Sequence, residues 1–510
     1  MAIKINNLEG DKYAEIRIPY LKENPVSHIE AWIEDINGKR IRTLTKKEIA
    51  DISSIETNNL YDEGRAKIFD LKSNAYPYVI KYKYSCKEKH FLSICDWVPF
   101  YREVPTHAAE LVIDIPASYK VSFFENKIDA MHKDSIKDRI IFTWQAKCEK
   151  PLLPEVYSPS ILELAPRVCV VPVQFNYGID GTQENWVAFG NWAYNLNKGL
   201  DDLPLGEIQK VMDLTKGIED KKLIVKKLYQ YLQDNTRYVS VQIGVGGFKS
   251  FPASFVADKK YGDCKALSNY MKALLKAAGI PSHAVLIYGG NEQGTYRTIP
   301  DFVSAMQFNH VILMVPLDKD TIWLDCTSKI NPAGYLGSFT QNRYALIIDE
   351  NKSKLIKTPA LIPSNCYTLC NNNIHIDTNG NALLKSSTVC KGYGFDMNTL
   401  YATALNKDKQ KEYLEEIIPY QDFEVKQLYI KNGGHDSAAV ELDYQIILKS
   451  NISQSGKYLF LQLSNPRLPE FESPSKRHFP VRLAWPINYM DSTEITIPDK
   501  YTVKKIRMKI

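Results

Sequence analysis

The chain has 510 residues, of which 44% are apolar and 24% are charged, and its 64 basic and 59 acidic residues leave a net charge of +5. This length is too great for one compact core and predicts about three domains. The near balance of charge, with no basic stripe, argues against a nucleic-acid-binding protein. No run approaches the ~18 consecutive apolar residues that a membrane-spanning helix needs.

Residues 1–155 are predicted to form a β domain. The dipeptide Asn37-Gly38 is typical of a two-residue hairpin turn, and apolar-alternating runs flank it within residues 31–44. Further strands are predicted at 78–84, 111–116 and 140–144. A stretch with prolines at 151, 154, 159 and 166 follows and is typical of a linker.

Residues 156–358 differ in the spacing of their apolar residues and are predicted to form an α+β core. Helical spacing of apolar residues favours helices at 186–198, 205–216 and 222–234, and another helix that begins near Cys264. Strands are then predicted at 284–288, 309–315 and 321–326. Helices followed by an antiparallel sheet define the α+β class.

Residues 359–510 are predicted to form a second β domain. Pro359 and Pro363 mark its start, and Asn379-Gly380 indicates a hairpin turn. One helix is expected at 396–417 among the strands. The fold class predicted for the whole chain is therefore multidomain, with an α+β core between two β-sandwich-like domains.

Cys264 is the candidate nucleophile, because it falls at the start of a predicted buried helix. Asp263 suits the N-cap of that helix, and the run from Gly279 to Pro281 suits its end. A free thiol has a pKa of roughly 8.5, and the positive end of a helix dipole stabilises the reactive thiolate. The same helix start can hold an oxyanion.

His310 and Asp325 are the candidate partners of this thiol. His310 begins a predicted strand, Asp325 lies near the end of the next one, and 316–320 can form the turn between them. An even-length hairpin loop is expected to place the two residues directly opposite each other, about 4.5–5.5 Å apart at Cβ. Asp325 could then orient the imidazole while its other nitrogen faces Cys264.

Three segments carry a resemblance to a known superfamily: Tyr261-Gly262-Asp263-Cys264-Lys265, Phe308-Asn309-His310-Val311-Ile312 and Trp323-Leu324-Asp325-Cys326-Thr327. Together they resemble the transglutaminase-like superfamily. The whole chain resembles bacterial cell-envelope proteins that have an N-terminal domain of the DUF3857 type, a transglutaminase-like core and a C-terminal β domain. The segments 60–65 and 97–100 are similar to landmarks of that N-terminal domain, and 237–244 is similar to the approach to the catalytic helix. Ala266 departs from the acidic residue that often follows the lysine in the superfamily.

This resemblance implies a papain-like fold for the core and a Cys264–His310–Asp325 triad. It implies a cysteine-dependent enzyme that acts on peptide-like amide bonds and passes the acyl group to water or to an amine. Gln242 or Tyr238 is expected to supply a side-chain oxyanion donor. No cofactor and no metal are expected, the partner is a peptide or protein substrate, and an extracytoplasmic location is expected although the chain shows no signal peptide.

Alternative hypotheses remain beside the triad. Cys264, His310 and Cys326 could bind zinc, although they lack the close pairs of ligands that are typical of zinc sites. Cys366 and Cys370 could bridge or bind a metal, but simple packing is favoured. The chain could also be a non-catalytic envelope protein in which the core is a scaffold for binding.

Overall fold

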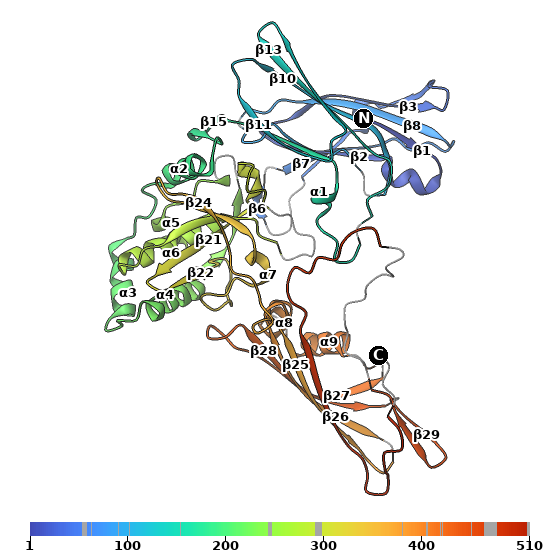
Figure 1. Ribbon diagram of the computed structural model, residues 1–510, viewed down its shortest axis with the longest axis vertical. Helices are drawn as coiled ribbons and strands as arrows, with labels where there is room; N and C mark the ends of the chain where they lie inside the picture. Colours follow the sequence, from blue (N-terminus) through green and yellow to red (C-terminus); the bar gives the residue numbers. More distant parts are fainter. Residues whose placement is uncertain are drawn as a thin grey trace.

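The computed structural model describes the chain except for residues 54–58, 63, 90, 101–102, 154, 243–246, 291–297, 380, 404–405, 419, 421, 450, 464–476 and 507–510. Figure 1 shows three successive parts along the long axis: a strand-rich N-terminal part, a mixed core beside it, and a C-terminal sheet at the far end. The multidomain, sheet-rich fold class predicted from the sequence is confirmed.

The N-terminal part consists of sheets that pack against each other in pairs. In the first pair, β1 (Ala2–Ile5), β8 (Tyr78–Cys86), β3 (Val26–Asp35) and β4 (Arg40–Thr43) form one sheet, and β2 (Glu15–Leu21), β7 (Gly64–Asp70) and β5 (Ala50–Ser53) form the other. Alternate apolar side chains of both sheets, among them Ile16, Ile33 and Phe69, share one buried cluster. The predicted turn at Asn37-Gly38 joins β3 to β4, with Gly38 at a φ of +81°.

A second pair of sheets completes this part. It contains β10 (Thr106–Pro116), β13 (Arg139–Cys148) and β12 (Ala130–Ile136) on one side, and β11 (Val121–Asn126), β14 (Arg167–Pro172) and β9 (Cys95–Trp97) on the other. Between them lie Phe142, Trp144 and Val168. Because β14 pairs with β9 and β11, strand pairing of the N-terminal part continues past the boundary predicted at residue 155. The boundaries at 155 and 358 remain predictions.

The core is a sheet covered by helices. The sheet has the antiparallel order β22 (Asp320–Leu324), β21 (His310–Leu317), β20 (His283–Ile287), β23 (Tyr344–Ile347) and β24 (Lys354–Lys357). The helices are α2 (Trp186–Asn197), α3 (Leu205–Thr215), α4 (Lys221–Asn235), α5 (Ala253–Lys259) and α6 (Cys264–Ala277). The helices predicted at 186–198, 205–216 and 222–234 correspond to α2, α3 and α4. The sequence did not indicate α5, β23 or β24.

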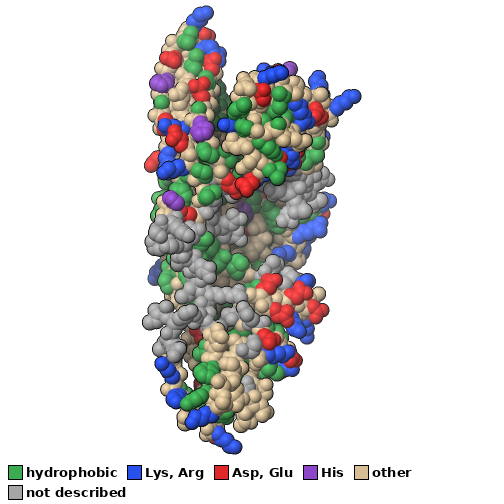
Figure 2. Space-filling view, turned by 90° about the vertical axis from the view of Figure 1, so that its right-hand side faces the viewer, with side chains coloured by type: hydrophobic (Ala, Val, Ile, Leu, Met, Phe, Trp, Pro, Cys, Tyr) green, Lys and Arg blue, Asp and Glu red, His purple; other side chains and the backbone are tan. Residues whose placement is uncertain are grey.

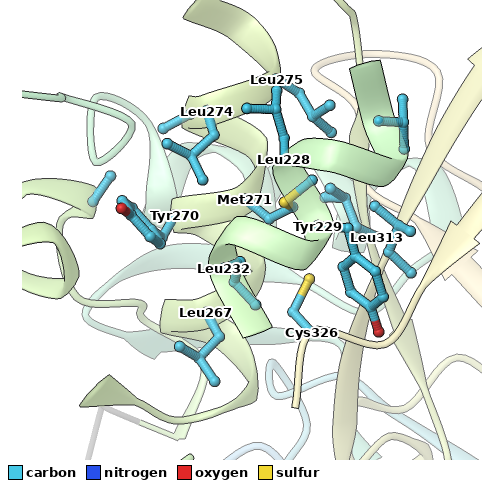
Figure 3. Close-up of a cluster of buried hydrophobic side chains, with 14 of the residues drawn as sticks. Leu228, Tyr229, Leu232, Leu267, Tyr270, Met271, Leu274, Leu275, Leu313 and Cys326 are labelled. Carbon is cyan, nitrogen blue, oxygen red and sulfur yellow. The ribbon is translucent and has the colours of Figure 1, made fainter. Parts of the chain in front are cut away.

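Helix α6 lies against β21 and against α4, as Figure 3 shows for their buried side chains. Leu267, Met271 and Leu274 project from one face of α6 into this cluster, where they meet Leu228 of α4 and Leu313 of β21. The spacing of apolar residues at three and four positions therefore places this face in the core. The buried helix places its first residue, Cys264, in an apolar cluster with Val311, near the start of β21.

The C-terminal part is a single five-stranded sheet, within the residues that the structure describes, with a small hairpin of β29 (Ile452–Ser455) and β30 (Tyr458–Leu461) beside it. Its strands are β27 (Phe423–Asn432), β28 (Ala439–Leu448), β26 (Ala382–Lys391), β25 (Thr368–Ile376) and β31 (Tyr489–Thr496). Helices α8 (Tyr393–Thr403) and α9 (Lys407–Ile417) cover one face through Phe395, Leu414 and Ile418. A β-sandwich-like domain was expected here, but in the described residues helices, and not a second large sheet, cover this face.

Two local predictions in the C-terminal part had different outcomes. The single helix predicted at 396–417 is wrong, because the chain forms α8 and α9 instead. The side chain of Asn406 accepts a hydrogen bond from the backbone N–H of Lys409 and so starts a new helix. Gly380 of the predicted turn lies outside the described residues, and β25 and β26 pair antiparallel on either side of it.

The C-terminal segment returns to the linker between the first two parts. The carboxylate of Glu155 accepts hydrogen bonds from the backbone N–H groups of His478 and Phe479 at 2.6 and 2.9 Å. Arg482 pairs with Glu163 at 2.6 Å. The C-terminal part is therefore attached to the linker as well as to the core.

Candidate active site

Cys264 is the first residue of α6 and is only 4% exposed. Asp263 is the N-cap, as the sequence predicts: one carboxylate oxygen accepts a hydrogen bond from the backbone N–H of Ala266 at 3.0 Å. The other carboxylate oxygen pairs with the buried ammonium of Lys265 at 2.7 Å. Gly279 follows the helix at a φ of +73°, which suits the C′ position. The thiol therefore stands at the positive end of a well-capped helix.

His310 and Asp325 are brought together in the interior. The imidazole Nε2 lies 3.1 Å from Oδ2 of Asp325, and the two residues are 8% and 4% exposed. Because a carboxylate can only accept, Nε2 carries the proton and Nδ1 is left for the thiol. The structure thus joins two of the three predicted triad residues by a direct hydrogen bond.

The strand register differs from the expected one. β21 and β22 are connected by a two-residue turn and pair Leu313 with Leu324. Continuing that register would place His310 opposite Thr327, so Asp325 is a diagonal neighbour and the expectation of a directly opposed pair is wrong. The parity of the two positions fixed only the shared face of the sheet, whereas the position of the turn, at residues 318–319, fixed which residues are opposed.

Asp325 is held in place by groups from its own loop and from α4. Its Oδ1 accepts hydrogen bonds from the hydroxyl of Thr327 at 2.7 Å and from the backbone N–H of the same residue at 3.1 Å. The hydroxyl of Tyr229 donates to the carbonyl oxygen of Asp325 at 2.7 Å. Gln233 donates to the carbonyl of Ser328 at 3.0 Å. These bonds fix the loop after β22 against the helix behind it.

The thiol and the imidazole are also held against each other. Ser268, one turn along α6 from Cys264, donates to the carbonyl of Val311, the residue after His310, at 3.3 Å. Cys264 and Val311 belong to one buried apolar cluster with Phe308. Helix α6 is therefore tied to β21 at the level of Cys264 and His310.

The charges of this site reinforce one another. Burial by itself lowers the pKa of His310, but the negative charge and hydrogen bond of Asp325, together with a hydrogen bond to Cys264, outweigh it and raise that pKa from 6.5 to about 10. Burial tends to raise the pKa of Asp325, but the neighbouring imidazolium and Thr327 bring it below its ordinary value. The imidazole of His310 therefore holds its proton at neutral pH, next to Cys264.

The aromatic ring of Phe339 forms a wall over the imidazole. Phe339 belongs to the short helix α7 (Gly337–Thr340), and its ring meets that of His310 edge to face, with centroids 5.2 Å apart and planes at 73°. A Cβ at Gly289 would come within 2.6 Å of the Phe339 ring, so a larger residue there would displace this ring. Phe339 is 38% exposed, so its outer edge faces the solvent next to the buried pair.

Tyr238 lies beside the start of α6. Its strand β17 (Arg237–Tyr238) runs parallel to β19 (Tyr261–Gly262), immediately before Asp263. Burial, and next the charge of Cys264, raise the pKa of Tyr238, although 44% of the residue is exposed. The side chain of Gln242, the other expected oxyanion donor, lies outside the part of the chain that the structure describes.

Sequence reasoning missed several residues that build the site. Tyr229 was read only as part of an apolar helix face, and its hydroxyl gave no signal of a bond 96 positions away. Phe339 lies in a segment for which no element was predicted. Lys265 was noted as part of the motif, but only the structure shows it buried against Asp263.

Within the described residues, the other cysteines and possible metal ligands form no second site of this kind. All nine cysteines are free thiols, and Cys366 and Cys370 hydrogen-bond to different partners, Pro486 and Tyr489. Burial raises the pKa of Cys326, the neighbour of Asp325. Across the described ranges, no group of three or more His, Cys, Asp or Glu side chains could hold a metal ion, so the zinc alternative finds no support there. No helix in those ranges is long and apolar enough to cross a membrane.

Replacing Asp263 with alanine is expected to lower the free energy of unfolding by about 3–5 kcal/mol, because it leaves the buried ammonium of Lys265 unpaired. Loss of the N-cap accounts for roughly 1 kcal/mol of that. Urea denaturation measures the change. Asp258→Ala is a matched control, since the ion pair that Asp258 makes with Lys259 is on the surface. Equal stability of the two variants would contradict the structural role of the buried pair.

Comparison with protein families assigns two parts of the chain. Residues 208–327 match the model of the transglutaminase-like superfamily, and residues 1–152 match that of DUF3857, a domain of unknown function with a solved structure. The chain therefore carries a DUF3857 domain followed by a transglutaminase-like core, as its sequence motifs indicate. The core match contains Cys264, His310 and Asp325. Among curated proteins nothing matches the chain.

Three solved structures match the chain. A protein from Parabacteroides distasonis described as a "putative protease" is 13% identical, with a TM-score of 0.55, and the match covers 88% of this chain and 89% of that one. A "putative cysteine protease" from Cytophaga hutchinsonii is 11% identical (TM-score 0.21; 50% and 82% covered), and the periplasmic domain of TgpA from Pseudomonas aeruginosa is 15% identical (TM-score 0.19; 59% and 87% covered). Because its sequence identity is only 13%, the first match supports the fold and nothing further. The TM-scores of the other two matches are too low to support any conclusion.

Proposed function

We propose that the chain is a cysteine-dependent enzyme that cleaves peptide-like amide bonds through an acyl-enzyme, with Cys264 as nucleophile, His310 as base and acid, and Asp325 as the group that orients the imidazole. The observation that carries this proposal is the buried imidazole of His310, which bonds to Asp325 at 3.1 Å and also faces Cys264. A thiol at a helix start beside an imidazolium is the environment that activates cysteine.

In the first step, the thiolate of Cys264 attacks the carbonyl carbon of the amide, and the carbonyl π electrons move to oxygen. The tetrahedral intermediate collapses, the C–N bond breaks, and the imidazolium of His310 donates its proton to the leaving amine. The second step reverses these roles: the neutral imidazole takes a proton from water or from an acceptor amine, which attacks the thioester and releases the thiolate. Throughout, Asp325 keeps Nε2 protonated and stabilises the imidazolium.

The oxyanion of the tetrahedral intermediate needs a hydrogen-bond donor, and we assign this role to the hydroxyl of Tyr238. The support is its place beside the start of α6, where the charge of Cys264 affects it. Tyr238→Phe is expected to lower kcat by about 10²–10³ without changing KM, since the bond forms only in the transition state. Steady-state kinetics test this, and an unchanged kcat would exclude the hydroxyl. Gln242 stays the second predicted donor.

The substrate we infer is a peptide or protein chain. The space-filling view shows the surface hollowed between the N-terminal and C-terminal parts, with hydrophobic side chains inside the hollow (Figure 2). Such a shape suits an extended peptide. An extracytoplasmic location stays a prediction.

The test is to incubate the purified chain with a mixed peptide library, with and without a primary amine, and to identify products by mass spectrometry. New carboxylate ends define a peptidase or amidase, and amine conjugates define an acyltransferase. The matched control is Cys264→Ala. If neither product forms and the protein still retains peptides, the proposed enzymatic function is contradicted and a non-catalytic binding protein is favoured. The low exposure of Cys264 is also compatible with such a binding protein.

A further inference from the structure

The C-terminal part contacts both ends of α7: the carboxylate of Asp396 lies at its start, and the carbonyl of Ala484 accepts a hydrogen bond from the side chain of Gln341, directly after its end, at 2.8 Å. Asp396 of α8 accepts a hydrogen bond from the backbone N–H of Ser338 in α7 at 2.6 Å and another from the hydroxyl of Tyr335 at 2.8 Å. Tyr335 also donates to the carbonyl of Gly392 at 2.9 Å and packs edge to face on Phe395. These bonds cross the boundary that the sequence predicts at residue 358, so they join the C-terminal part to the core.

The fit around Asp396 is close. Gly337, the first residue of α7, has a φ of +63°, and a Cβ there would come within 2.8 Å of a carboxylate oxygen of Asp396. Asp396 is itself largely buried, and burial raises its pKa even though Ser338 and Tyr335 donate to it. A buried carboxylate without its donors would be costly. The position of α7 is therefore coupled to that of α8.

On its other side, α7 contacts the catalytic pair. The ring of Phe339, one residue after Ser338, covers the imidazole of His310. The carbonyl of Phe339 accepts a hydrogen bond from the backbone N–H of Gly290 at 2.9 Å, and Arg343 donates to the carbonyls of Ser338 and Tyr288 at 3.0 and 2.7 Å. The route from Asp396 to His310 thus passes through two adjacent residues of a four-residue helix.

We propose that Asp396 is a positioning residue through which the C-terminal part controls the catalytic histidine, because it holds α7 where Phe339 shields the His310–Asp325 hydrogen bond from water. As a control of catalysis this inference rests on the proposed function. As a physical coupling between Asp396 and His310 it can be measured without any substrate.

Shielding matters because an ion pair is strengthened where water is excluded. If Phe339 withdraws, water can reach the imidazole and screen the charges of Asp325 and Cys264, which at present outweigh the effect of burial on His310. The proton affinity of His310 should then fall. A contact that only stabilised the fold would leave this property of the folded protein unchanged.

The experiment follows the titration of His310 by NMR in ¹³C-histidine-labelled protein, in the full chain. Asp396→Ala is expected to lower the proton affinity of His310 by about two- to thirty-fold. Phe339→Leu is expected to lower it similarly, and the double variant no further than Phe339→Leu alone. Asp396→Asn keeps an acceptor for the backbone N–H of Ser338. In this variant the proton affinity of His310 should therefore stay close to that of wild type. Met397→Ala, at the next, exposed position of α8, is the control.

Three results would overturn the coupling. One is an unchanged His310 titration in folded Asp396→Ala. Another is an additive effect in the double variant, which would mean that Asp396 does not act through Phe339. The third is an equal shift in Met397→Ala, which would indicate general loosening of α8. Failure of the proposed function would be seen in a different measurement, the peptide-library experiment, as absence of peptide turnover by the wild-type chain.

Discussion

Cys264→Ala is expected to abolish turnover of any peptide substrate, with a fall in kcat of about 10⁴–10⁶. The alanine has no nucleophile, and no other described thiol lies at a helix start beside an imidazolium. The fold should survive, because Cys264 fills a small position in an apolar cluster that the change enlarges only slightly. Steady-state hydrolysis and circular dichroism of the variant measure the two effects.

The matched control is Cys326→Ala. Cys326 is equally buried and follows Asp325 directly, but burial raises the pKa of its thiol and so keeps that thiol protonated. This variant should keep most of its activity. Loss of activity in Cys326→Ala together with retention in Cys264→Ala would show that the wrong thiol has been assigned.

Asp325→Asn has the second largest expected effect, a fall in kcat/KM of about 10³–10⁴. An amide can orient the imidazole through its oxygen, but it does not stabilise the imidazolium, and rotation of the amide can force the wrong tautomer. The pKa of His310 should fall, because the charge of Asp325 raises it. Kinetics and His310 titration measure both changes.

The stabilising effect of the His310–Asp325 pair is expected to depend on pH from both sides. The raised pKa of His310 gives a contribution that is complete below 6.5 and is lost as the pH rises through about 10. The lowered pKa of Asp325 gives a second stabilising contribution. This contribution is present when the pH is above the ordinary pKa of an aspartate, and it is lost as the pH falls through the pKa that Asp325 has in the folded protein. The stability difference between wild type and Asp325→Asn should therefore narrow at both extremes. A difference that does not change with pH would contradict the ion pair.

The sequence was most informative where local rules act. Asp263, the apolar stripe of α6 and Gly279 together define a capped, buried helix, so the place of Cys264 could be predicted from residues within a few turns of it. The strand that begins at His310 and the strand that ends directly before Asp325 were also predicted from the sequence. Their exact pairing was not, because a two-residue turn sets the register and the sequence allows several turns between 316 and 320.

Contacts between distant segments could not be predicted in this way. The bond of Tyr229 to the Asp325 carbonyl and the packing of Phe339 on His310 depend on how separate elements meet. The C-terminal part shows the same limit: alternating strands predict a half-buried sheet, but they do not say whether a second sheet or helices cover it. There α8 and α9 do so, and α8 also carries Asp396 to the active-site wall.

The most direct test of the central claim is the rate at which iodoacetamide labels Cys264 as a function of pH, read by peptide mass spectrometry in wild type and in His310→Ala. Exposed Cys86, whose pKa is raised, is the internal reference within the same chain. We predict that Cys264 reacts faster than Cys86 below neutral pH and that His310→Ala removes this advantage. Labelling of Cys264 that is no faster than that of Cys86 in both proteins would contradict an activated cysteine–histidine pair.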